Sequence, residues 1–466
     1  MQQKNLRSAL AIIITVFFFW GFVAASNGIF IPFCKKHFQL SQFESQLIDS
    51  TFYGGYFIGS LLLLALSRIF RVDILNRIGY KRGIIYGLLI SILGALAIIP
   101  SVNAGSFPLI LGSFFILALG FSLQQTCAQP FVIALGNPSG GAHRLSLAGG
   151  VNSLGTTLGP LAVGFILFGT LSGSGAASLS SINELYYLLA GVFLLVALFL
   201  WRANLPEIRN DEPYEPGFGA LKHPQLLLGM LAIFTYVGVE VTIQSNMGAL
   251  LAEPAFGAWK EHEIAPFISM YWGSLMIGRW AGSLAVFNFS PRIKYLMSVL
   301  IPVAAFGVVI AVNELSGKSM ANMYPYLFCV AVLILNFLLS KEKPARTLLL
   351  FSIFGLAAMV VGLLTTGMVS IFAFLSGGLA CSIMWPCIFA LSIAGLGKYA
   401  AQGSAFLIMM ILGGAVIPPV QGMLADSLGI HQSYIVTLFC FAYLAYFAYR
   451  AKTLSPGADE PATMAH

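Results

Sequence analysis

Charged residues are scarce in this sequence. Of its 466 residues only 9% are Asp, Glu, Lys or Arg, whereas 58% are hydrophobic and the mean hydropathy is +0.88. Soluble globular proteins carry about 25% charged residues, so this composition predicts a polytopic membrane protein. The net charge of +7 does not indicate a nucleic-acid partner, because the basic residues flank apolar runs, as membrane orientation requires.

Signals of metal binding and catalysis are also missing. The six cysteines lie mostly inside apolar runs without CxxC or Cys/His spacing, where cysteine behaves as a small core residue. The six histidines fall at the ends of apolar runs, in loops or in tails. We therefore expect no enzyme, no bound metal and no cofactor, apart from a sodium ion or proton that is transported.

Long apolar runs fill the sequence instead. A helix needs about 20 apolar residues to cross a bilayer, and this rule predicts an all-α membrane protein of about fourteen spanning helices. The predicted spans lie near 8–32, 46–66, 83–100, 108–136, 146–170, 185–202, 225–251, 266–288, 296–313, 324–340, 347–365, 368–395, 403–424 and 431–450.

The basic residues orient these spans. With the N-terminus in the cytoplasm, nineteen of the 24 Lys and Arg residues fall in cytoplasmic segments, four fall on the opposite side, and Arg279 lies inside a span. This asymmetry predicts that both termini are cytoplasmic. We expect an integral protein of the cytoplasmic (inner) membrane.

One long connection and a repeat divide the chain. A linker at 204–224, rich in Pro and charge, separates a six-helix bundle at 1–203 from a C-terminal bundle at 225–453, which a tail at 454–466 follows. The run Gln129-Pro-Phe-Val-Ile-Ala-Leu-Gly136 is similar to Trp385-Pro-Cys-Ile-Phe-Ala-Leu-Ser392. Tandem halves with a site between them are typical of secondary transporters.

Amide and hydroxyl side chains gather in the fourth and fifth spans. Gln125 and Gln129 are one turn apart beside Gln124, and Asn152 precedes Thr156 by one turn. Polar groups at membrane depth need partners. Their clustering favours a polar ligand in a cavity, although such groups also join packed helices.

Among the 17 acidic residues only Glu240 lies deep in a span. A carboxylate there indicates function: with Gln244 and Asn246 it could bind sodium, carry a proton, contact a sugar, or serve structure alone. Asp49, near the outer end of the second span, and Arg279 are candidate gating residues; a helix cap and a snorkelling side chain are the structural alternatives. Trp385 beside Pro386 is the candidate to stack on a sugar ring.

Several motifs carry a family resemblance. They are Trp20-Gly-Phe, Phe52-Tyr-Gly-Gly-Tyr-Phe, Arg77-Ile-Gly-Tyr-Lys-Arg82, Arg144-Leu-Ser-Leu-Ala-Gly-Gly-Val-Asn-Ser, Tyr236-Val-Gly-Val-Glu-Val, Ser382-Ile-Met-Trp-Pro-Cys-Ile-Phe and the Gly-rich run that ends at Asp426. Together they resemble the fucose–galactose–glucose symporter family of the major facilitator superfamily. The resemblance implies a sugar carrier in which two pseudo-symmetric six-helix bundles rock around a central site.

The resemblance also implies residue roles. It carries Asn27, Gln125 and Asn152 over as sugar contacts. The proton carboxylates of the family are replaced, one by Gly28 and the other by Gln125. The likeness weakens at 296–340, which we interpret as a helix pair inserted into a twelve-helix plan.

These observations predict a secondary active transporter for a monosaccharide, a hexose or amino-hexose, that works by cation-coupled symport. We favour sodium over the proton because both family carboxylates are absent. The alternatives are an uncoupled sugar uniporter and a drug or metabolite exporter. The expected partners are the sugar and membrane lipid, and the protein is expected to be a monomer.

Overall fold

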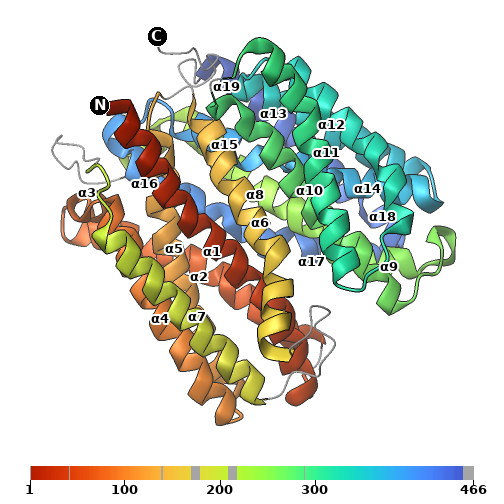
Figure 1. Ribbon diagram of the computed structural model, residues 1–466, viewed down its shortest axis with the longest axis horizontal. Helices are drawn as coiled ribbons and strands as arrows, with labels where there is room; N and C mark the ends of the chain where they lie inside the picture. Colours follow the sequence, from red (N-terminus) through yellow and green to blue (C-terminus); the bar gives the residue numbers. More distant parts are fainter. Residues whose placement is uncertain are drawn as a thin grey trace. The chain divides into compact units, whose positions relative to one another are not determined.

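A computed structural model describes residues 2–40, 42–137, 140–168, 179–207, 218–287 and 289–454 (Figure 1). Over these residues every regular element is a helix, which confirms the all-α prediction. Eleven segments of the described chain are long and apolar enough to cross a membrane. The helices α1 (Gln2–His37), α6 (Gly141–Phe168) and α10 (Glu261–Gly282) occupy the three other predicted spans, so the expected number is approximately right.

The remaining helices of the first half follow the predicted spans closely. They are α2 (Gln42–Ile69), the short α3 (Ile74–Ile78), α4 (Tyr80–Asn103), α5 (Phe107–Ala134) and α7 (Leu179–Arg202). A short 3-10 helix, η2 (Gly219–Lys222), closes the described part of the predicted linker; residues 208–217 and the tail from 455 lie outside the described residues.

The second half contains more breaks. Its helices are α8 (Pro224–Ser245), α9 (Met247–Ala252), η3 (Pro254–Phe256), η4 (Ser283–Val286), α11 (Pro291–Leu315), η5 (Ala321–Tyr326), α12 (Leu327–Ser340), α13 (Pro344–Leu364), α14 (Gly367–Cys381), α15 (Met384–Ile393), η6 (Gly397–Tyr399), α16 (Ala400–Met409), η7 (Met410–Leu412), α17 (Gly413–Leu428), α18 (Ile430–Ser433) and α19 (Ile435–Leu454). Four predicted spans are therefore helix pairs: α8 with α9, α14 with α15, α16 with α17, and the short α18 with α19.

Proline accounts for one of these breaks. Pro386 has no N–H to donate to the carbonyl of Ser382, four residues earlier, so the helical hydrogen-bond pattern is interrupted there. The hydroxyl of Ser382 donates to the carbonyl of Leu379 at 2.6 Å. The break lies against Gly278 of α10, where a Cβ atom would be 1.8 Å from the Ser382 oxygen. Only glycine fits at this crossing.

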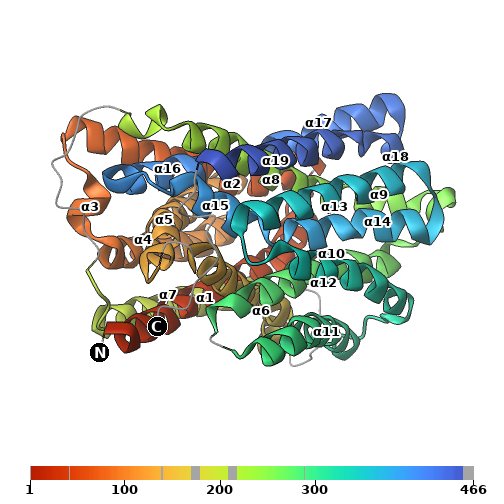
Figure 2. The same cartoon turned by 90° about the horizontal axis from the view of Figure 1, so that it is seen from above.

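The chain forms two compact units. The first unit comprises Met1–Gly136, Leu154–His223 and Leu396–Leu412, and the second comprises Asn137–Ser153, Pro224–Gly395 and Gly413–His466. In the first unit α4 packs along both α5 and α7, and α2 packs on α5 (Figure 1). In the second unit α13 packs against α14 and α19, and α8 packs against α15, α17 and α19 (Figure 2).

Each unit contains one segment from the other half of the sequence. The segment Asn137–Ser153, which contains the start of α6, belongs to the second unit, and the segment Leu396–Leu412, which contains α16 and is called the α16 segment below, belongs to the first. The sequence predicted a division at the linker alone. Tertiary contacts thus divide α6 and the α16–α17 pair between the units, whereas the sequence treated each as one span of one half.

The helices α11 and α12 fall in the segment interpreted as an insertion. α11 packs on α10, and α12 packs on α13 and α14. Many of their side chains remain exposed, among them Leu296, Leu300, Phe328 and Leu335. This apolar exposure suits contact with lipid; that the pair is an insertion stays a prediction.

Candidate functional site

In the first unit the three glutamines of α5 differ in their surroundings. Gln124 is fully buried, and both ends of its amide are occupied. Its Oε1 accepts a hydrogen bond from Trp20 Nε1 at 2.7 Å, and its Nε2 donates to Ser91 Oγ at 2.9 Å. Gln124 therefore joins α1, α4 and α5, which is the packing role that the sequence left open as an alternative.

Gln125 points to a different neighbour. It is half-buried, and its Nε2 donates to the phenol oxygen of Tyr56 on α2 at 2.8 Å. Its Oε1 accepts from Gln129 Nε2 at 3.5 Å, a long bond. The resulting row of a phenol and two amides, Tyr56–Gln125–Gln129, contains both donors and acceptors, which is what the hydroxyl groups of a sugar require.

Two predicted residues of the first unit have side chains outside the described part of the structure. Asn27 lies within α1 and Asp49 within α2, but only their backbone is described. Their roles as a sugar contact and a gating residue stay predictions.

In the second unit Glu240 is the centre of a charged group. Its Oε1 accepts a hydrogen bond from Tyr236 OH at 2.8 Å and lies 3.6 Å from Arg279 NH2. The Glu240 side chain is 13% exposed and that of Arg279 is 16% exposed. In addition, Tyr271 OH donates to the backbone carbonyl of Glu240 at 2.7 Å. The carboxylate is thus paired, as a charge inside a membrane protein must be.

Arg279 connects this group to the start of α6. Its NH1 donates to Ser153 Oγ at 2.9 Å, next to the predicted contact Asn152. Trp280 Nε1 donates to the Gly150 carbonyl at 3.1 Å, and Ser146 Oγ donates to the Arg279 carbonyl at 3.1 Å. The ion pair of Arg279 with Glu240 therefore joins α8 and α10, and the bond of Arg279 to Ser153 reaches a helix of the first half of the sequence.

Trp385 lies beside the same group. Its ring centroid is 6.1 Å from that of Tyr236 and 5.9 Å from that of Phe389. Trp385 is half-buried, whereas its neighbours Met384 and Pro386 are buried. Tyr236 touches both the indole and the carboxylate, so an aromatic face and a carboxylate are available together.

The two other predicted partners of Glu240 are placed differently. Gln244 is half-buried one turn further along α8. Asn246 lies at the break between α8 and α9, and its Nδ2 donates to Gln421 Oε1 at 2.5 Å. Six residues of helix span about 9 Å, so the break and Glu240 are more than one turn apart. We therefore place Asn246 in the α8–α17 contact and not beside the Glu240 carboxylate.

The sequence did not predict which residue Arg279 pairs with. A signal was available, because Glu240 is the only acid, and Arg279 the only Lys or Arg, that lies away from the ends of a predicted span. Two lone opposite charges in an apolar environment are expected to pair. Ser153 was not among the predicted site residues, and only the fold brings it to Arg279.

Comparison with known proteins gives the class of this fold. The model of the Major Facilitator Superfamily matches residues 11–339. The chain is 33% identical over 451 residues to a glucose/galactose transporter of Brucella abortus, covering 96% of this chain and 94% of that protein. It is 26% identical over 478 residues to the L-fucose-proton symporter of Escherichia coli, and the match covers 97% of this chain and 95% of that protein.

Solved structures agree on the fold. A crystal structure of the transporter FucP in the outward conformation matches with a TM-score of 0.74 at 24% identity, covering 95% of this chain and 98% of that one. The proton:xylose symporter XylE matches with a TM-score of 0.57 at 15% identity, and the match covers 97% of this chain and 96% of that one.

The chain is therefore a membrane transporter and not an enzyme. It belongs to the Major Facilitator Superfamily and, within it, to the fucose–galactose–glucose symporter family, as the motifs predicted.

Proposed function

We propose that the protein is a secondary active transporter for a hexose or amino-hexose that works by symport with a proton. The observation that carries the proposal is the group of Glu240, Tyr236, Arg279 and Trp385 in the second unit. An aromatic ring beside a carboxylate suits a pyranose, whose C–H face is apolar and whose hydroxyl groups donate hydrogen bonds.

We assign the sugar contacts within each unit separately. In the first unit they are Gln125 and Gln129, with Asn27 as a further candidate, and in the second unit Asn152, Glu240, Gln244 and Trp385. Gln124 is left out because both ends of its buried amide are already bonded. The relatives named for glucose, galactose and fucose support this substrate class.

The sodium preference gains no support. The coupling ion named among the relatives is the proton, and the surroundings of Glu240 argue the same way. A sodium ion on this carboxylate would lie near the guanidinium of Arg279, 3.6 Å from the carboxylate oxygen, and like charges repel. A proton instead neutralises the carboxylate without adding a second cation.

Protonation of Glu240 would act through Arg279. The neutral acid no longer holds the guanidinium by charge, while Tyr236 and the sugar can still bond to the carboxyl oxygens. Arg279 keeps its bond to Ser153 on α6. A proton and a sugar arriving at Glu240 together would thus loosen the contact between α8 and α10.

Uptake in proteoliposomes tests the proposal. A panel of radiolabelled hexoses and amino-hexoses is offered with an inward proton gradient, with an inward sodium gradient, and with neither. We expect accumulation with the proton gradient alone. Accumulation with sodium alone would restore the earlier preference, equilibration without either gradient would indicate a uniporter, and no sugar flux with efflux of apolar drugs would indicate an exporter.

A substitution separates coupling from binding. Glu240→Gln keeps the shape and an acceptor for Tyr236 but cannot exchange a proton. We expect it to abolish accumulation and to retain sugar exchange between the two sides. Accumulation at the wild-type level would remove Glu240 from the coupling step.

Trp385 tests the sugar contact. Trp385→Phe keeps an aromatic ring, and Trp385→Ala removes it. We expect KM to rise about tenfold in Trp385→Ala, for a loss of about 1.4 kcal/mol, with a smaller rise in Trp385→Phe. Equal KM values in all three proteins would remove the ring from the site.

A further inference from the structure

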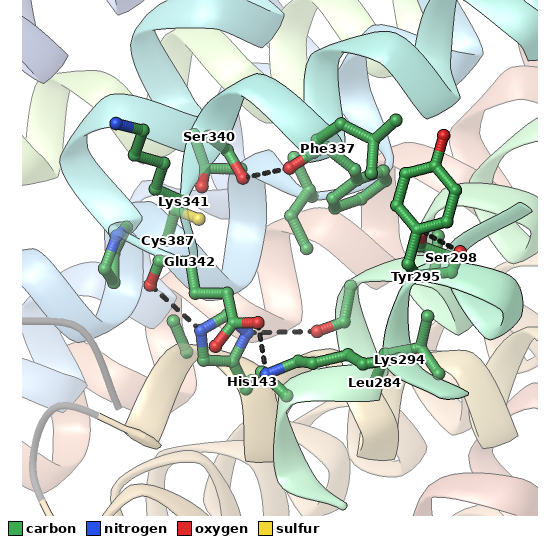
Figure 3. A pocket seen from close by; sticks show the side chains of 18 of the residues that line it. His143, Leu284, Lys294, Tyr295, Ser298, Phe337, Ser340, Lys341, Glu342 and Cys387 are labelled. Carbon is green, nitrogen blue, oxygen red and sulfur yellow. Dashed lines mark hydrogen bonds and ion pairs between the residues drawn. The ribbon is translucent and has the colours of Figure 1, made fainter. Parts of the chain in front are cut away.

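A cavity of about 280 Å³ lies in the second unit, and its lining residues do not include those of the Glu240 group (Figure 3). Its walls come from the first turn of α6, from η4, from the start of α11, from the α12–α13 turn and from α15. Tyr295 in this wall is 63% exposed and Lys341 is also exposed, so the cavity reaches the surface. The buried imidazole of His143 lines it.

Both ring nitrogens of His143 meet backbone carbonyl oxygens. Nδ1 lies 3.0 Å from the carbonyl of Gly282, and Nε2 lies 3.2 Å from the carbonyl of Glu342 (Figure 3). A carbonyl oxygen can only accept a hydrogen bond. Neutral imidazole has one N–H and one lone pair, so it can satisfy only one of these contacts. Both bonds exist together only when the ring carries a second proton.

These two bonds hold three segments together. His143 belongs to the first turn of α6, which comes from the first half of the sequence, whereas Gly282 ends α10 and Glu342 lies in the α12–α13 turn. The turn itself is strained, since Lys341 has φ 54° and Glu342 has φ 59°, both unfavourable for residues with a Cβ atom. It depends on such contacts to keep its shape.

The charged groups around the ring do not replace the second proton. Lys294 of α11 forms an ion pair with the carboxylate of Glu342, so these two facing charges cancel. Lys341 is exposed on the turn, the Cys387 thiol faces the cavity from α15, and Arg144 on α6 donates to the Asn137 carbonyl. The two carbonyl oxygens beside the ring can therefore both accept a hydrogen bond only from a ring that carries N–H on both nitrogens.

We propose that His143 is a second proton-binding site, whose imidazolium form fastens the first turn of α6 to α10 and to the α12–α13 turn. Loss of the proton leaves a lone pair facing one of the two carbonyls, and that contact is lost. The conformation in which His143 holds both carbonyls therefore binds one proton more than the conformation in which one contact is lost. The first conformation is favoured as pH falls. Imidazole is the side chain suited to this exchange between pH about 5 and 8.

Hydrogen exchange tests the site without any sugar. The amide exchange of residues 141–153 is measured on the full chain in detergent at several pH values between 5 and 8.5. The rates are corrected with the unfolded peptide of the same sequence. We expect protection of this segment to fall about tenfold as pH rises, the effect of one hydrogen bond. In His143→Gln the protection should be independent of pH, because the amide does not titrate.

His431 provides a matched control. It also lies in the second unit, but its Nε2 meets one carbonyl, that of Gly362 at 2.8 Å, which a neutral ring can satisfy. His431→Gln should keep the wild-type pH dependence at 141–153. A pH-independent wild type would overturn the proposal even if His143→Gln did not fold, and so would an unchanged pH dependence in His143→Gln. Because no substrate is present, either result is separate from the fate of the transport proposal.

Discussion

The start of α6 and the α16 segment share one feature but differ in the groups that hold them. Each is a segment from one half of the sequence that packs in the unit formed mainly by the other half. The start of α6 is held in the second unit through two ionisable side chains, Arg279, which also pairs with Glu240, and His143, and through neutral bonds of Ser146 and Trp280.

Two neutral side chains bond the α16 segment into the first unit. Ser404 Oγ donates to the carbonyl of Thr126 at 2.9 Å, and Gln402 Oε1 accepts from the Ala220 N–H at 2.9 Å. The first bond has a simple cause: Pro130, four residues after Thr126, has no N–H for that carbonyl. Neutral bonds of this kind do not respond to protons, whereas the contacts of α6 with Arg279 and His143 respond to them under the two proposals made above. On those proposals, ion coupling acts on the α6 side.

The largest effect is expected from a substitution that breaks the charged contacts of Arg279. Arg279→Ala removes the cation from Glu240 and the bond to Ser153. An unpaired charge in such a place costs about 3–5 kcal/mol, so we expect the lowest thermal midpoint in detergent and no accumulation of sugar. The double variant Arg279→Ala with Glu240→Gln should recover most of the stability but not the accumulation. A single variant as stable as wild type would show that the ion pair does not hold α8 to α10.

A smaller effect tests the neutral arrangement. Ser404→Ala leaves the buried carbonyl of Thr126 without its hydroxyl partner, which costs about 1–3 kcal/mol. The loss should be the same at pH 6 and pH 8, in contrast to that of His143→Gln. Thermal unfolding at both pH values measures it.

Pro130→Ala sharpens this test. The alanine N–H can bond the Thr126 carbonyl within α5, so Ser404→Ala should cost less in the Pro130→Ala background than alone. Equal costs in the two backgrounds would mean that the missing proline N–H is not the reason for the Ser404 contact.

The smallest expected effect concerns Trp280. Trp280→Phe keeps a ring in place and removes only the N–H that bonds the Gly150 carbonyl. We expect a loss of about 1 kcal/mol and a roughly fivefold faster amide exchange at 147–153. Trp201→Phe is the control, since the Trp201 side chain is 66% exposed on α7. Unchanged exchange in Trp280→Phe would show that the Trp280 bond does not hold the start of α6.

Much of the fold could be predicted because the bilayer restricts it. Apolar runs of about 20 residues predict helices directly, and the predicted spans agree with the described helices within a few residues at most ends. The breaks between α14 and α15 and between α8 and α9 were harder to predict. A proline marks the first, but the second follows the polar Asn246, whose contact with Gln421 on α17 has no local signature.

The candidate site was only partly predictable, because the sequence marks residues that are rare inside spans but not the contacts that they make. Glu240, Arg279 and Trp385 were recognisable because charge and a proline-linked aromatic residue are rare inside spans. Gln124 and Gln125 are adjacent in sequence, yet one is bonded at both ends inside the helix packing and the other points to Tyr56. The helical turn of about 100° between neighbours sends them to different surroundings.

The sequence by itself determined that this chain is a helical membrane transporter, because hydropathy and motif content are local properties. Only the tertiary structure decided that Arg279 holds both Glu240 and Ser153, and that His143 stands between two carbonyls. Such contacts join residues more than 35 positions apart. Their geometry depends on helix packing, which local sequence does not specify.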